Sequence, residues 1–125
     1  MYWWSDFDFG EVQEELAIIH ELDLTHIRIF LLCDDFQPAP DKISMSKLKN
    51  LEKLCDIAES YHLKLNVTYF TGHMSGSNWA PRWMLHEEKP IYVKQVVSGG
   101  KIVESGYLNP YADKLVLSAQ IYQLK

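Results

Sequence analysis

The stretch that most constrains the fold is an apolar run over residues 63–70, which leads directly into a polar segment over residues 71–83. The run is predicted to be a buried strand. Its two faces would carry Leu63, Leu65, Val67 and Tyr69 on one side and Lys64, Asn66, Thr68 and Phe70 on the other. The polar segment holds imidazole, amide, guanidinium and indole groups. Reactive side chains of α/β proteins gather at the carboxyl ends of strands. The pattern therefore predicts a loop that binds a polar ligand with apolar faces, such as a sugar.

The preceding part of the chain alternates helix and strand. Apolar residues recur at helical spacing over about residues 9–22 and 45–61, and Asp8 with Glu11 resembles a capping box. The run over residues 25–32 is almost continuously apolar, which indicates a strand covered on both faces. Short connections in the order helix, strand, helix, strand predict a parallel sheet. We expect strands 25–32 and 64–70 to be parallel neighbours.

The pattern changes in the last third of the chain. Two β-type runs, over residues 91–97 and 101–104, flank Gly99-Gly100, which permits the positive φ angles of a tight turn. We read them as a small hairpin that decorates the loop. Asp113 is a good cap for a third helix that begins near Leu115. The segment over residues 33–41 contains two prolines and is predicted to be a loop.

Composition narrows the class of protein. A chain of 125 residues with 47% apolar and 23% charged residues predicts a single domain over residues 1–125. The sequence lacks an apolar run long enough for a membrane span, and its start does not resemble a secretion signal. A net charge of -5 argues against nucleic acid as a partner. Cys33 and Cys55 do not suggest a disulfide framework, so we expect reduced thiols and a cytoplasmic location.

No cofactor is expected. The five histidines show no metal-ligand spacing, and the chain carries no Gly-rich phosphate cradle or serine nucleophile motif. Asp34 and Asp35 are adjacent, so on an extended backbone their carboxylates point to opposite sides and do not form an acid/base pair. We expect instead that one of these two aspartates orders the loop by accepting hydrogen bonds from backbone amides.

Residues 25–32, the run Asp34-Asp35-Phe36-Gln37-Pro38 and residues 71–79 together resemble the early part of a glycoside hydrolase (β/α)8 barrel. The likeness is to the cellulase and β-mannanase-like group, family 5 and its relatives. It covers nearly the whole chain but only roughly the first third of such a barrel. The resemblance implies an α/β fold: a partial TIM barrel with about strands 2 and 3, flanking helices and a small β-hairpin insertion.

The family that this chain resembles uses two catalytic glutamates, one after the fourth barrel strand and one on the seventh. The resemblance places both beyond this chain, so no catalytic residue is expected here. Arg28 matches an arginine on strand two that supports the nucleophile, and His73 is the nearest match to a histidine that binds sugar. Relatives often have Trp where this chain has Cys33, so one sugar-stacking platform is missing.

The residues expected to bind substrate share a position at or near the end of a predicted strand; they are Arg28, Asp34, His73, Asn78 and Trp79. Structural alternatives exist for several of them. Arg28 could be a strand arginine buried against a carboxylate, because an unpaired buried charge is costly. His73 could order the loop. Trp79 and Trp83 could stack on sugar rings or cap the hydrophobic rim, and for Trp83 we favour the rim.

Three hypotheses follow. The first is a truncated glycoside hydrolase whose lineage hydrolyses β-linked glucan or mannan, with an oligosaccharide or polysaccharide as its partner. The second is a non-catalytic partial barrel that assembles with itself or with a complementing barrel half and binds carbohydrate weakly. The third is a small independent α/β domain of unrelated function. An Asn-Glu motif in the genomic sequence downstream would favour the first.

Overall fold

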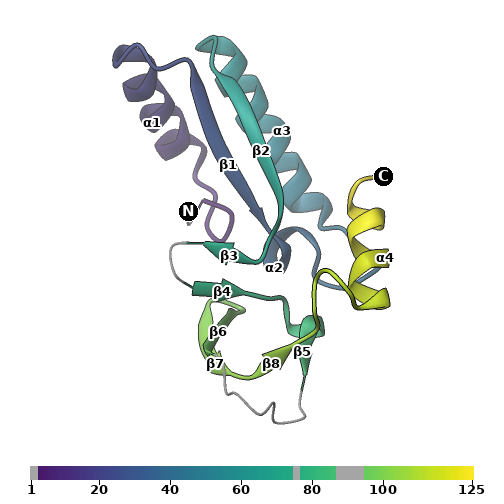
Figure 1. Cartoon of the computed structure of the whole chain (residues 1–125). Helices are drawn as coiled ribbons and strands as arrows, with labels where there is room; N and C mark the ends of the chain where they lie inside the picture. Colours follow the sequence, from purple (N-terminus) through teal and green to yellow (C-terminus); the bar gives the residue numbers. More distant parts are fainter. Residues whose placement is uncertain (1–2, 75–76, 87–94) are drawn as a thin grey trace. The chain divides into compact units, whose positions relative to one another are not determined.

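A computed structural model describes residues 3–74, 77–86 and 95–125 of the chain (Figure 1). The chain forms two compact units. The first unit comprises Met1–Leu31 and Met45–Thr68, and the second comprises Leu32–Ser44 and Tyr69–Lys125. In the described residues, no helix has both the length and the apolar character needed to cross a membrane.

The first unit has the predicted α/β order. Its elements are α1 (Phe9–Glu21), β1 (His26–Leu32), α3 (Met45–Ser60) and β2 (Lys64–Thr71). Strands β1 and β2 are hydrogen-bonded neighbours, and Figure 1 shows their arrows pointing the same way. The two helices contact each other. The prediction of parallel neighbouring strands is therefore confirmed, whereas their numbering as barrel strands 2 and 3 stays a prediction.

Both helices of this unit end in the same way. Asp23 after α1 and His62 after α3 adopt left-handed φ angles of 56°. The backbone N–H of the next residue, Leu24 or Leu63, then reaches back to a carbonyl of the last helical turn, at 3.3 and 2.8 Å. This is the Schellman arrangement, which usually uses glycine at the left-handed position. It turns each helix directly into the strand that follows.

The N-terminal segment is fixed to this unit by two contacts. The Asp8 side chain accepts a hydrogen bond of 2.8 Å from the backbone N–H of Glu11, which confirms the predicted cap of α1. The indole of Trp4 is buried and donates a hydrogen bond of 2.8 Å to the carbonyl of Phe30 in β1. This bond satisfies the one polar atom of a large apolar side chain, which is why an indole can be buried there.

The second unit corrects the prediction of a loop at residues 33–41. The segment begins with a single helical turn, α2 (Cys33–Phe36), and an isolated bridge joins Ala39 to Lys42. Residues 71–83 were also expected to be a loop, but they contain β3 (His73–Met74), β4 (Ser77–Trp79) and most of η1 (Arg82–Met84). Elements this short span too few residues to produce a hydrophobic period, so the sequence could not reveal them.

The predicted hairpin is present as β6 (Gln95–Ser98) and β7 (Lys101–Glu104). Gly99 and Gly100 have φ angles of 57° and 72°, as a tight hairpin turn requires. Residues 91–94, expected at the start of the hairpin, lie outside the described part. Strand β6 also pairs in parallel with β4, so the order β3-β4-β6-β7 forms one sheet. The hairpin therefore extends the strands after β2 and does not merely decorate a loop.

Helix α4 (Lys114–Gln123) and a small antiparallel pair, β5 (Leu85–His86) with β8 (Gly106–Tyr107), complete the unit. Asp113 caps α4 as predicted, because its side chain accepts from the N–H groups of Leu115 and Val116. The core residues are fully or nearly buried; they are Ala80, Met84, Val96 and Val116, with Trp83, Leu85, Val103, Tyr107 and Leu108 packed against them.

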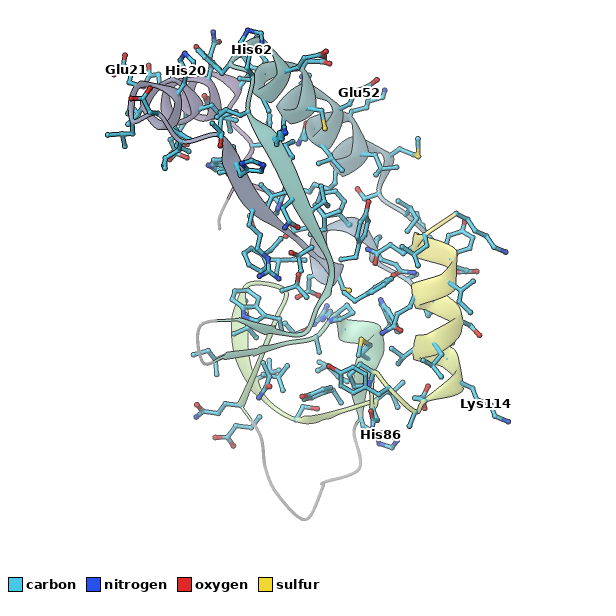
Figure 2. All side chains as sticks on the ribbon, turned by 45° about the horizontal axis from the view of Figure 1, so that its top comes forward. His20, Glu21, Glu52, His62, His86 and Lys114 are labelled. Carbon is cyan, nitrogen blue, oxygen red and sulfur yellow. The ribbon has the colours of Figure 1, made fainter. Side chains whose placement is uncertain are left out.

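We predict that His62→Gly stabilises the chain by up to about 1 kcal/mol, because glycine adopts a left-handed φ without the steric cost of a β-carbon. His62 is exposed at the end of α3, so little packing is lost (Figure 2). Urea unfolding followed by circular dichroism measures the change. Glu59→Gly, inside the last turn of α3, is the matched control and is expected to destabilise by about 1 kcal/mol. Equal effects of the two substitutions would contradict this account.

Candidate functional site

Arg28 lies on β1 and interacts with both strands of the first unit. Its Nε donates a hydrogen bond of 2.8 Å to the hydroxyl of Thr68 on β2. Its guanidinium carbon lies 4.9 Å from the centre of the Phe30 ring, which is within the range of a cation–π contact. A guanidinium carries five N–H donors, and the bond to Thr68 uses one. The two groups that hold the side chain, a hydroxyl and an aromatic ring, are both uncharged.

The sequence-based expectation that Arg28 is buried among apolar neighbours is wrong. The residue is exposed, because alternate β1 side chains such as Ile29 and Leu31 face the core while Arg28 points to the other face. An exposed guanidinium does not carry the desolvation penalty of a buried charge. An Arg28 without a carboxylate partner therefore need not destabilise the folded chain.

Asp34 lies in α2, directly after β1, and it fixes the hairpin turn. Its Oδ2 accepts a hydrogen bond of 2.9 Å from the backbone N–H of Gly99, and the backbone N–H of Arg82 also points to this carboxylate. A carboxylate that binds N–H groups from two distant segments holds them in one arrangement. This is the loop-ordering role weighed for one of the two aspartates from sequence; contact of Asp34 with a ligand stays a prediction.

Burial raises the pKa values of two side chains in this segment, Cys33 and Asp34. Desolvation is the main cause that raises the pKa of Asp34 above its ordinary 3.8; the charge of Asp35 adds to the rise, while Gly99 and Arg82 oppose it. Burial, together with the charge of Asp34, also raises the pKa of the Cys33 thiol to about 11. A thiol with this pKa stays protonated near neutrality and is a poor nucleophile. Cys33 is therefore a structural residue and does not act as a nucleophile.

Gln37 is a functional position that sequence reasoning missed. Its side chain is 1% exposed, and its amide donates to the carbonyls of Pro40 at 2.9 Å and Ala119 in α4 at 2.8 Å. Its own backbone carbonyl accepts from the Trp83 indole at 2.9 Å. The only sequence signal is an amide residue next to Phe36 in a proline-containing segment, which does not point to any partner. Gln37 joins the segment after β1 to both η1 and α4.

Asn78 and Trp79, two of the three predicted binding residues after β2, do not share one face of β4. The backbone of His73 pairs with Asn78 between β3 and β4, and the side chain of His73 lies outside the described part. The Asn78 amide oxygen lies 3.4 Å from the hydroxyl of Tyr107, a residue packed on the core. Trp79 follows Asn78 in the same strand, so its indole points to the opposite face.

The two tryptophans of this segment differ in their environment. Trp83 donates its indole N–H to Gln37 and packs on the core, as the rim interpretation expected. Trp79 is half-buried, and its Nε1 is buried without a hydrogen-bond partner in the described structure. The hydroxyls of Thr71 and Ser98 are likewise buried without a hydrogen-bond partner in the described structure. An unsatisfied buried donor costs about 1–3 kcal/mol, so these three atoms lower the stability of the folded chain unless a partner reaches them.

Two groups of candidate residues result. Arg28, Phe30 and Thr68 form one group in the first unit, whereas Asp34 and Trp79 belong to the second unit. Among the described side chains, no set of three or more His, Cys, Asp or Glu residues is placed to hold a metal ion. The chemistry offered by the two groups is that of hydrogen bonding and stacking, which is suited to hydroxyl-rich ligands with apolar faces.

Glycoside hydrolases are among the solved structures that this chain resembles. A GH5_18 variant from Streptomyces cattleya, in complex with Manb1-4GlcNAc, matches 98% of this chain with a TM-score of 0.74 and 27% identity. An exo-beta-1,4-mannosidase from Opitutaceae bacterium strain TAV5 matches 95% with a TM-score of 0.74 and 20% identity. A GH5_18 protein from Bifidobacterium longum subsp. longum ATCC 55813 matches 94% with a TM-score of 0.70 and 24% identity.

The chain has a GH5-like glycoside hydrolase fold. It spans only 25%, 18% and 24% of the length of the three matched chains, as a partial barrel does. No protein-family model matches the sequence, and no curated protein matches it either. The resemblance to family 5 is thus confirmed for the fold over the length of this chain. The choice among cellulase-like and mannanase-like activities is not decided by it.

The Asp34 carboxylate gives a pH prediction. Because folding raises its pKa above 3.8, the folded chain binds more protons than the unfolded chain just above that pH. The free energy of unfolding should therefore fall as pH rises through this window. Asp34→Asn keeps an acceptor oxygen for Gly99 and should remove this part of the slope. Asp34→Ala removes the acceptor and should cost about 1–2 kcal/mol at neutral pH.

Urea unfolding at a series of pH values measures both effects. Asp41→Asn, at an exposed carboxylate, is the matched control and should leave the slope unchanged. If wild type and Asp34→Asn had the same pH dependence, the desolvation of Asp34 would not contribute to stability.

Proposed function

We propose that the chain is a carbohydrate-binding part of a glycoside hydrolase lineage whose members act on β-linked glucan or mannan, and that it lacks the catalytic glutamates. The observation that carries the proposal is the match of 98% of the chain to a GH5_18 protein in complex with Manb1-4GlcNAc. The similarity to the structure of an exo-beta-1,4-mannosidase favours a β-linked sugar that contains mannose over a glucan as the ligand.

In this proposal Trp79 supplies the stacking surface. Its indole is half-buried, which leaves part of an aromatic face for the apolar side of a sugar ring. Asn78 lies on the opposite face of β4 from Trp79 and would not share this stacking surface, whereas Asp34 would keep the neighbouring hairpin turn in place.

Arg28 would act as a second polar contact. Thr68 and Phe30 hold the guanidinium without neutralising it, so its free donors are available to an acceptor oxygen of a ligand. In a complete catalytic site the same charge would support a carboxylate nucleophile, as the resemblance implies. Without that carboxylate, Arg28 contributes to binding and not to bond cleavage.

A second candidate function is a non-catalytic module that self-assembles or joins a complementing barrel half. Strands β1 and β2 form a sheet of two strands, and both of its edges are open within the first unit. Open edges and an uncovered strand face favour association with another polypeptide. This candidate does not exclude weak sugar binding.

Titration with mannose-containing β-linked disaccharides, followed by tryptophan fluorescence, tests the binding proposal. We expect a dissociation constant on the order of millimolar, because the contact surface is small. Trp79→Ala should abolish the change, and Trp79→Phe should retain part of it. Trp3→Phe, a substitution in the first unit, is the control and should leave binding unaltered. A fluorescence change that survives Trp79→Ala would refute the role given to this residue.

We also predict that the chain alone does not hydrolyse glycosides. Hydrolysis needs two carboxyl groups about 5–5.5 Å apart for retention or roughly 6.5–9.5 Å apart for inversion. Asp34, the best-placed carboxylate, is engaged by backbone N–H groups. Aryl β-glucosides and β-mannosides, together with polymeric glucan and mannan, are suitable substrates. Turnover that disappears in Asp34→Asn would show that this chain carries its own catalytic group.

A further inference from the structure

Helix α4 presents an apolar stripe to solvent in addition to its buried face. Leu117, Ile121 and Leu124 are 38%, 59% and 64% exposed. They recur at positions i, i+4 and i+7, so they lie on one side of the helix. Lys114 and Lys125 stand at the two ends of this set, and Figure 2 shows Lys114 extending away from the helix. We call these five residues the α4 stripe.

Helix α1 carries a matching stripe of opposite charge. Ile18 and Leu22 are 56% and 65% exposed, and both lie away from the buried face of the helix. Glu11 and Glu14 continue the same side toward the start of α1 and are also exposed. We call these four residues the α1 stripe. Each stripe therefore combines two or three exposed aliphatic side chains with two charges of one sign, and the signs differ between the stripes.

We propose that the α4 stripe is the docking site for the α1 stripe of a second copy of this chain. The apolar spacing agrees, because Ile18 and Leu22 are four residues apart, as are Leu117 and Ile121. Helices whose aliphatic residues repeat at this spacing pack side by side with their stripes in contact. The aliphatic groups supply the buried area, and the glutamates and lysines select the partner.

Charge also determines the symmetry of this contact. Pairing two α1 stripes in parallel would place four glutamates together, and pairing two α4 stripes in either orientation would place lysines opposite lysines at both ends. Both arrangements are disfavoured by like-charge repulsion, whereas α1 against α4 brings opposite charges together. The contact is therefore heterologous, and an open assembly keeps one free α1 stripe at one end and one free α4 stripe at the other unless a ring closes. Assemblies should grow past the dimer as concentration rises.

This inference uses residues separate from those proposed to bind sugar. Trp79 and Arg28 belong to neither stripe, so association and sugar binding can fail independently. A loss of fluorescence response to sugar in Trp79→Ala, with unchanged association, would concern the binding proposal alone.

Sedimentation velocity and light scattering of the full chain over a concentration series test the inference. Ile121→Ser should weaken association about tenfold or more, because it removes the central aliphatic side chain of the stripe. Replacing Glu11 and Glu14 by Lys should also weaken it, and so should replacing Lys114 and Lys125 by Glu. Combining both charge reversals in one chain should restore association, since opposite charges then meet again.

Two controls separate this contact from nonspecific association. Ile102→Ser changes an exposed isoleucine on β7, and replacing Glu52 and Glu59 by Lys reverses two charges on α3; neither change should alter association. The charge-reversal effects should also shrink at high salt. Far-UV circular dichroism confirms that each variant is folded. A chain that stays monomeric at every concentration, or an assembly that both charge reversals leave unchanged, would overturn the proposal.

The results of these experiments also identify what binds the α4 stripe. If the wild-type chain is monomeric and binds an apolar dye that Ile121→Ser reduces, the α4 stripe is a surface for a different polypeptide. If the combined charge reversal fails to restore association that each single reversal weakened, the two stripes do not meet and the heterologous contact is refuted.

Discussion

The side-chain amide of Gln37 is the contact on which the second unit depends. It lies where the chain leaves β1, and its buried donors are satisfied by carbonyls of Pro40 and Ala119. Its backbone carbonyl binds the indole of Trp83. Loss of any partner would leave a buried polar group unsatisfied, so these segments must be placed together. A helix, a helical turn and the segment after β1 are thus fixed by one residue.

Asp34 extends this arrangement to the hairpin. It precedes Gln37 by less than one helical turn and binds the N–H groups of Gly99 and Arg82. The short segment after β1 therefore organises most of the second unit through one carboxylate and one amide. Parallel-sheet proteins build their sites from segments at the carboxyl ends of strands. Here such a segment mainly supports its neighbours.

The sequence predicted local structure correctly where a residue interacts with residues close to it in the chain. Asp8 and Asp113 cap helices, and Gly99-Gly100 makes the hairpin turn. Contacts between distant segments were not predictable. The bond from Gln37 to Ala119 joins positions 82 residues apart, and no periodicity or motif encodes it. The exposure of Arg28 was misjudged for a related reason: an apolar run indicates two covered faces only when enough neighbouring elements are present to cover them.

The two cysteines differ in access, and this affects how the chain behaves under oxidation. Cys33 is half-buried and protonated near neutrality, whereas Cys55 is exposed on α3. Only Cys55 can readily meet a thiol of another copy, so air oxidation yields covalent pairs and nothing longer. Assembly through helix stripes has no such limit. Larger species that persist in the presence of a reducing agent are therefore a sign of noncovalent association, and the Cys55→Ser variant removes the covalent background.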